Sequence, residues 1–129
     1  MKNNKKKKII FIVNIDSFFI SHRLPIAEEL IKIGYEVHLA TEFTKFKNKI
    51  SKIGIKTHHV DFKRNSLNIF FAFKAIFQIF LLIFKEKPKI LHLVSLKPIV
   101  FGGLIPFFCH INLVVVSITG LGSMFIKKI

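Results

Sequence analysis

Polar side chains that are able to bind a phosphate or a sugar gather immediately after the first apolar run of the chain, residues 9–13. Hydroxyl groups and cations bind sugar hydroxyls and phosphate oxygens, and the forked donors of arginine fit phosphate geometry. A carboxylate in the same segment can accept a proton or a hydrogen bond from an acceptor hydroxyl. The candidates in this segment are Asp16, Ser17, Ser21, His22 and Arg23.

Most of these candidates also have a structural interpretation. Asp16 follows a predicted strand, where an aspartate often forms a turn, so it is either a proton acceptor or a turn former. Ser21 is predicted to cap the next helix, which places His22 and Arg23 in the first turn, where the helix dipole favours an anionic ligand. We expect both cations to contact an anion there. The alternative for His22 is that it is simply a polar residue in the capped turn and contacts no ligand.

Two later apolar runs, residues 89–95 and 112–118, also lead into polar or glycine residues. The candidates there are Ser95, Lys97, Thr119, Gly120 and Gly122. Lys97 is either a solvated lysine or a phosphate ligand. Thr119 joins Asp16 as a candidate catalytic residue, and the glycine amides are candidates for lining a sugar site.

The elements that must position these candidates alternate between short β-branched runs and longer helical stretches, separated by glycine, proline or polar residues. Strands are predicted at residues 9–15, 36–41, 55–60, 89–95 and 112–118. Helices are predicted over residues 21–33, 44–53 and 67–84, and from Pro98 onward.

This alternation predicts an α/β fold, a Rossmann-like parallel sheet with flanking helices and right-handed crossovers. Ligands of such sheets bind beyond the carboxyl ends of the strands. Since every candidate residue lies at or beyond the carboxyl end of a predicted strand, we expect all of them on one shared rim.

The composition limits the classes of protein to consider. With 129 residues, 51% of them hydrophobic and 16 of them phenylalanine, the chain is one domain and is not a disordered tail. A net charge of +14 predicts attraction to anionic lipid, phosphorylated substrates or nucleic acid. The lysines are scattered and no recognised reading helix accompanies them, so we expect no specific nucleic-acid partner.

The sequence predicts neither a disulfide nor a metal site. Cys109 is the single cysteine and lies in an apolar segment. His58 and His59 are adjacent on a predicted strand, so their side chains point to opposite faces. His38 and His92 fall inside predicted strands and are interpreted as core histidines.

Two long apolar stretches raise the alternative of a small integral membrane protein with two spans. Residues 67–84 carry one charge, and residues 99–126 carry none. Against this alternative, glycine and proline interrupt the second stretch, and Lys74 and Gln78 lie in the middle of the first. The first stretch also fits a core helix, or a helix lying in the membrane interface with its phenylalanines inserted.

Several segments in this order carry a resemblance to a known family. They include Asp16-Ser-Phe-Phe-Ile-Ser-His-Arg-Leu-Pro, Gly34-Tyr-Glu-Val-His-Leu-Ala-Thr, Pro88-Lys-Ile-Leu-His-Leu-Val-Ser-Leu-Lys-Pro, Gly102-Gly103 and Ser117-Ile-Thr-Gly-Leu-Gly. In them the chain resembles the amino-terminal domain of glycosyltransferase family 4, retaining enzymes of the GT-B fold. It is most similar to members that transfer sugars onto lipid-linked or surface-polysaccharide acceptors.

The resemblance implies a two-domain enzyme in which residues 8–126 form the acceptor-side domain, behind a basic leader at residues 1–7. The donor-binding half has no counterpart before Ile129. The nucleotide-sugar is a substrate of the complete enzyme, so no cofactor is implied. Many family members carry a His-Gly pair after the fifth strand, but Thr119-Gly120 stands here, so the role of that histidine is not carried over.

We therefore expect the incomplete amino-terminal half of a GT-B glycosyltransferase, cytoplasmic and peripheral to the inner face of the cytoplasmic membrane. Its expected partners are the missing C-terminal donor domain or a separate polypeptide, an anionic membrane surface and a lipid-linked sugar acceptor. Without the donor half, we expect no transfer. The alternatives are the two-span membrane protein and a non-catalytic binding module.

Overall fold

The structure of the chain is a computed structural model, and it describes residues 6–62, 69–94, 98–99 and 111–117. The strands are β1 (Lys8–Ile15), β2 (Glu36–Glu42), β3 (Lys56–His59), β4 (Ile90–Val94) and β5 (Leu113–Ser117). The helices are α1 (Asp16–His22), α2 (Leu24–Lys32), α3 (Lys47–Ile53) and α4 (Ile69–Glu86). Pro98 and Ile99 are also helical, as expected.

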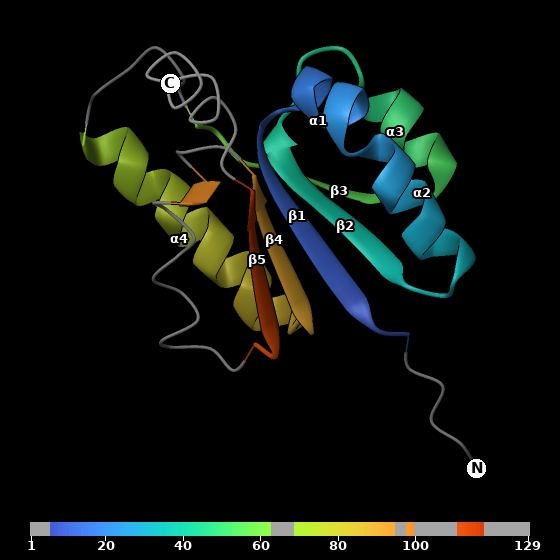
Figure 1. Cartoon of the computed structure of the whole chain (residues 1–129). Coiled ribbons are helices and arrows are strands. Elements are labelled where there is room, and N and C mark those ends of the chain that lie inside the picture. Colours follow the sequence, from blue (N-terminus) through green and yellow to red (C-terminus); the bar gives the residue numbers. More distant parts are fainter. Residues whose placement is uncertain (1–5, 63–68, 95–97, 100–110, 118–129) are drawn as a thin grey trace, which may run out of the picture.

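The strands form one parallel sheet in the order β3-β2-β1-β4-β5, which confirms the predicted Rossmann-like α/β fold (Figure 1). β1 lies at the centre of the sheet. β2 and then β3 lie on one side of β1, and β4 and then β5 lie on the other side. The strand order reverses between β1 and β4, and ligands of such folds bind beyond the carboxyl ends of the strands at this point.

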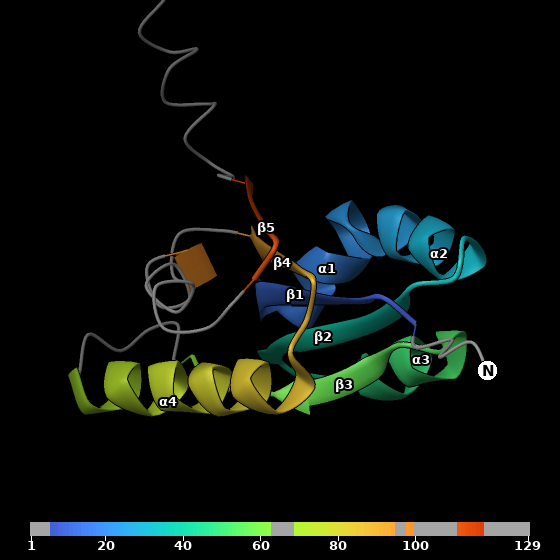
Figure 2. The same cartoon turned by 90° about the horizontal axis from the view of Figure 1, so that it is seen from below.

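Both faces of β1 are buried, which explains its unbroken apolar run. Ile10 and Ile12 pack in a cluster with Ala75 and Ile79 of α4. Phe11 faces the opposite way, into a cluster to which α1, α2 and α3 contribute side chains. Figure 2 shows α4 on one side of the sheet and α1 and α2 on the other. A strand covered on both faces has no polar side of its own.

The prediction of one helix over residues 21–33 is wrong at its amino-terminal end. The structure has two helices there, separated at Arg23, and Ser21 lies inside the first of them instead of capping the second. Pro25, in the first turn of α2, has no N–H to donate to the carbonyl of Ser21, and its ring crowds that carbonyl. The helix that begins at Asp16 must therefore end one turn before the proline.

The two-span membrane alternative is wrong for both stretches. Ala75, Ile79 and Ile83 of α4 are buried against the sheet. β5, residues Leu113–Ser117, lies within the second stretch and pairs with β4 along its length. In the described part of the chain, no helix combines the length and apolar character that a membrane crossing requires.

Asp16 fastens the end of β1 to the segment between β2 and α3. Its carboxylate is fully buried and accepts hydrogen bonds from the Thr44 amide at 2.9 Å, the Thr44 hydroxyl at 2.8 Å and the Phe46 amide at 3.1 Å. Because Thr44 and Phe46 are held in this way, α3 begins at Lys47 and not at the predicted residue 44.

Replacing this carboxylate by an amide tests its structural role. In Asp16→Asn we expect a loss of about 2–4 kcal/mol in the free energy of unfolding, because the charge-assisted bonds are lost and the buried donors keep poor partners. Urea unfolding followed by circular dichroism measures the loss. The exposed neighbour offers a control, Ser17→Ala, expected within about 0.5 kcal/mol of the parent. An Asp16→Asn protein as stable as the control contradicts the assignment.

Candidate functional site

The carboxyl ends of β1 and β4 lie side by side in the sheet. β1 runs directly into α1, and Arg23 is the residue between α1 and α2. Its charge acts on His92 of β4, so Arg23 lies close to that strand. Arg23 is half-buried, and one of its terminal nitrogens donates to the His22 carbonyl at 3.1 Å. Its Nε is buried and has no hydrogen-bond partner among the described residues.

Two further buried polar atoms at this edge lack partners among the described residues. They are Asn14 Oδ1, near the end of β1, and Thr41 Oγ1, near the end of β2. Buried polar atoms in folded proteins are nearly always paired, and a bound ligand is one way in which such atoms become satisfied. A guanidinium N–H suits an anionic group, and the two oxygens can each pair with a hydroxyl group.

His92 of β4 forms the floor beside Arg23. Its Nε2 lies 2.9 Å from Ser117 Oγ of β5, and its ring lies 4.9 Å from the ring of Phe11. Burial first, and the positive charge of Arg23 second, lower the pKa of His92 to about 4. The ring is therefore neutral at pH 7, and Arg23 carries the positive charge of this pair.

The structure places His22 differently from the prediction. His22 lies in the last turn of α1, not in a first turn, and there the helix dipole favours the cation itself and no anionic ligand. Its exposed ring stacks on Phe18 with centroids 4.1 Å apart. Ser17 and Ser21 are also exposed on α1. Of the five candidates after β1, Arg23 is the one that combines partial burial with an unpaired polar atom.

The carboxylate of Asp16 is engaged in hydrogen bonds that hold the fold together. Its two oxygens already accept three hydrogen bonds, and the side chain is fully buried. This geometry favours the turn-forming interpretation over the proton acceptor. The other candidates, Ser95, Lys97, Thr119, Gly120 and Gly122, lie outside the described residues, so their roles stay predictions.

A second polar group, at the opposite ends of the strands, was missed by the sequence reasoning. His38 Nδ1 of β2 lies 2.8 Å from His58 Nε2 of β3, and one ligand atom from each of these residues and from Glu86 lie within 4.8 Å of one another. The sequence reasoning compared His58 only with its neighbour His59. The sequence does show a histidine in each of two neighbouring predicted strands. It does not show the register between the strands, which decides whether the two side chains meet.

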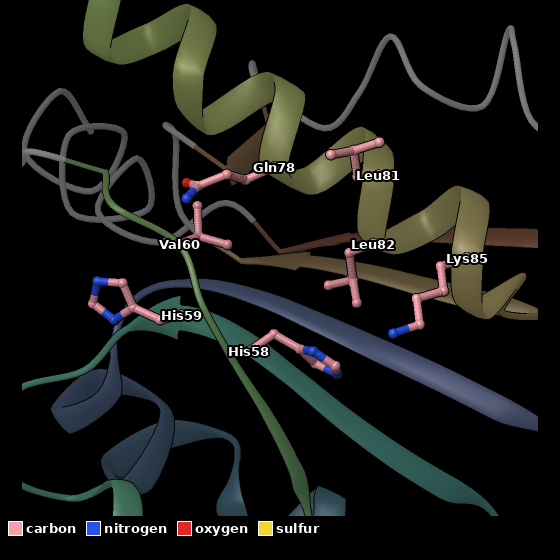
Figure 3. A pocket seen from close by; sticks show the side chains of 7 residues that line it. All are labelled: His58, His59, Val60, Gln78, Leu81, Leu82 and Lys85. Atoms are coloured by element: carbon pink, nitrogen blue, oxygen red, sulfur yellow. The ribbon is translucent and has the colours of Figure 1, made fainter.

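A hollow of about 340 Å³ opens between β3 and α4, next to this histidine pair. Figure 3 shows His58, His59, Gln78 and Lys85 around it, together with three apolar residues. It lies on the face of the sheet that α4 covers, whereas Arg23 and His92 belong to the other face. The part of the chain that the structure describes therefore contains two polar regions on opposite faces of the sheet.

Comparisons with known proteins identify the family of the sequence. A family model described as glycosyl transferase 4-like matches residues 8–128. Among curated proteins, none is similar enough in sequence to count as a match.

Solved structures share the fold at low sequence identity. A glycosyltransferase from Rickettsia africae matches with a TM-score of 0.70 and 18% identity over 87% of this chain and 29% of its own. MurG from Acinetobacter baumannii matches with a TM-score of 0.68 and 18% identity over 87% of this chain and 34% of its own. The chain thus spans about a third of the length of these enzymes.

The same fold also occurs outside glycosyltransferases. The C-terminal domain of a hydrogenase from Pyrococcus furiosus matches with a TM-score of 0.65 and 13% identity over 88% of this chain and 93% of that domain. Architecture alone therefore does not assign an activity.

The lowered pKa of His92 predicts a specific dependence of stability on pH. The unfolded chain binds this proton near pH 6.5, but the folded chain binds it only near pH 4. Between these values protonation favours the unfolded state, so His92 destabilises the fold as the pH falls. From pH 7 to pH 4.5 we expect this residue to contribute a loss of about 2 kcal/mol.

Urea unfolding of the parent and of His92→Gln at both pH values measures this contribution. The variant should lose about 2 kcal/mol less than the parent over the interval. Ser17→Ala, at an exposed residue that does not titrate, should lose as much as the parent. If the parent and His92→Gln lose the same free energy of unfolding between pH 7 and pH 4.5, the ring of His92 is not buried in its neutral form.

Proposed function

This chain belongs to the glycosyl transferase 4-like family, and on that premise we propose that it is the acceptor-binding half of a retaining glycosyltransferase. The acceptor is a sugar carried on a lipid diphosphate or a growing polysaccharide. The donor nucleotide-sugar binds to a second domain or polypeptide. The chain without that donor half is expected to transfer no sugar.

One observation carries the acceptor proposal. Arg23 is held at the carboxyl end of the central strand with a buried Nε that has no partner among the described residues. A phosphate group of a lipid-linked acceptor supplies the oxygens that this guanidinium lacks, and its fork can bind two of them at once. The ring of His92 is neutral at pH 7, so within this pair Arg23 is the residue that attracts a negatively charged group.

The unpaired oxygens support the sugar part of the proposal. Asn14 Oδ1 and Thr41 Oγ1 are buried near the ends of β1 and β2, and both can accept hydrogen bonds from sugar hydroxyls. Both residues lie near the carboxyl ends of neighbouring strands, the edge of the sheet at which the sugar is proposed to bind. Ser95, Thr119 and the amides of Gly120 and Gly122 are the further candidates for this site.

The outer face of α4 favours a lipid-bound acceptor over a free one. This face exposes large apolar side chains at helical spacing, each between 49% and 76% exposed: Phe70, Phe73, Phe77, Leu81 and Phe84. Together with the net charge of +14, it suits an anionic membrane, into which the rings insert while lysines attract the headgroups. We propose that the domain sits peripherally on the inner face of the cytoplasmic membrane.

Binding to vesicles separates the two parts of this proposal. The 129-residue chain is sedimented with anionic vesicles, with and without a polyprenyl diphosphate sugar in the bilayer. We expect binding to plain anionic vesicles, and tighter binding when the acceptor lipid is present. Arg23→Gln should lose that increment, about 10-fold or more in affinity, because a charge-assisted pair with phosphate is lost.

The matched variants assign each part of the binding. Arg23→Lys keeps the charge but loses the fork, and should retain only part of the increment. Phe73→Ser with Phe77→Ser should weaken binding to all vesicles equally, and Ser51→Ala, at an exposed position of α3, should change nothing. An acceptor-dependent increment that survives in Arg23→Gln overturns the acceptor site, and one that is absent from the parent does so too.

A further inference from the structure

The two histidines and two glutamates at the amino-terminal edge of the sheet form a compact group that the acceptor site does not use. They come from three elements: Glu36 and His38 from β2, His58 from β3 and Glu86 from the end of α4. We infer that His38, His58 and Glu86 form a binding site for a divalent transition-metal ion such as Zn²⁺. This inference does not depend on the proposed glycosyl transfer.

The ring of His38 is oriented as a metal ligand requires. His38 is buried, and its Nε2 lies 2.7 Å from Glu36 Oε2, so Nε2 carries the hydrogen that it donates to this carboxylate. Nδ1 is then the nitrogen with the free lone pair. Histidines that bind metals usually donate their other ring N–H to a carboxylate in this manner, which fixes the ring and raises its basicity.

The lone pair of His38 Nδ1 points at His58. The two nitrogens, His38 Nδ1 and His58 Nε2, are 2.8 Å apart and the rings are within 7° of parallel. Without a metal, His58 therefore donates its Nε2 hydrogen to His38. When an ion takes the place of this hydrogen, His58 shifts to the tautomer that is protonated on Nδ1, so no net proton is lost.

Only a small movement makes room for the ion. Nitrogens that share a tetrahedral zinc at about 2.0–2.1 Å lie about 3.3 Å from each other, so the rings must separate by about half an ångström. His58 can provide this movement because it is half-buried and lies on β3, which pairs with β2 alone among the described strands. Burial, the first cause, and the neighbouring His38 lower the pKa of His58, which favours the neutral form of the ring that a metal ion binds.

Glu86 supplies the third ligand from α4. One of its carboxylate oxygens lies within 4.8 Å of a ring nitrogen of His38 and of His58, and its Oε1 lies 3.1 Å from the Lys8 ammonium. Lys8 must turn away when a cation binds, and Glu36 Oε2, at 3.9 Å, is a second partner for it. Lys56, 3.5 Å from Glu36, adds another positive charge. These lysines lower the affinity of the site, and Zn²⁺, which favours imidazole nitrogen, fits it better than Mg²⁺ or Ca²⁺.

The hollow between β3 and α4 gives the ion a path to the histidines. His58 and Lys85 lie on its wall, as Figure 3 shows. Water in this hollow can fill the fourth position of a tetrahedral ion. A bound ion would join β2, β3 and the end of α4 in one place, so its effect on the fold is stabilising.

Competition between the 129-residue chain and a chromogenic chelator measures Zn²⁺ binding directly. We expect one equivalent per chain, with His58→Gln and Glu86→Gln each weakening the affinity at least 10-fold. Glu36→Gln should weaken it about 10-fold by releasing the His38 ring. The control is His59→Gln, because His59 is the next residue and lines the same hollow but points away from His38. It should stay within twofold of the parent, as should Cys109→Ser.

A second measurement keeps the inference testable if a variant fails to fold. In the parent chain, Zn²⁺ should shift the ring ¹⁵N resonances of His38 and His58 and leave those of the exposed His22 unchanged. The inference is overturned if the parent binds no Zn²⁺, if His58→Gln binds as tightly as the parent, or if His59→Gln or Cys109→Ser loses the same affinity. It is also overturned if the ring resonances of His38 and His58 do not move.

Discussion

The rest of the structure depends on the complete burial of β1. Residues 10–13 have no exposed surface, since neighbouring strands pair with both edges and helices cover both faces. No polar side chain can be placed along this strand without a large desolvation cost. The first positions at which the chain can present polar groups to a ligand are therefore at the end of the strand, from Asn14 onward, and the candidate site lies there.

The site follows from two local constraints on the residues after β1. Asp16 ties the start of α1 to Thr44 and Phe46, and Pro25 prevents α1 from continuing into α2. The resulting break turns the chain at Arg23, whose guanidinium is partly buried beside His92. Packing at the centre of the sheet and hydrogen bonding at its rim together place Arg23 where the phosphate contact is proposed.

The sequence predicted the sheet well because its strands are short apolar runs whose order fits a single topology. It did not predict the break at Arg23. Serine is a favoured N-cap residue and proline is tolerated in the first turn of a helix, so a single helix capped by Ser21 agreed with the local sequence preferences. The pairing of His38 with His58 was missed for another reason. It depends on the register between β2 and β3, in which His38 lies opposite Lys56 and His58 opposite Ala40, and a single sequence does not encode register visibly.

Amide hydrogen exchange tests the burial of β1 most directly. If β1 is the central strand, the amides of residues 10–13 exchange only through global unfolding and are the slowest in the chain. The amides of β3 and β5, at the two ends of the described sheet, exchange faster through local opening. Exchange in β1 as fast as in β3 would contradict the central claim, because a strand that opens so easily cannot hold the residues that follow it in place.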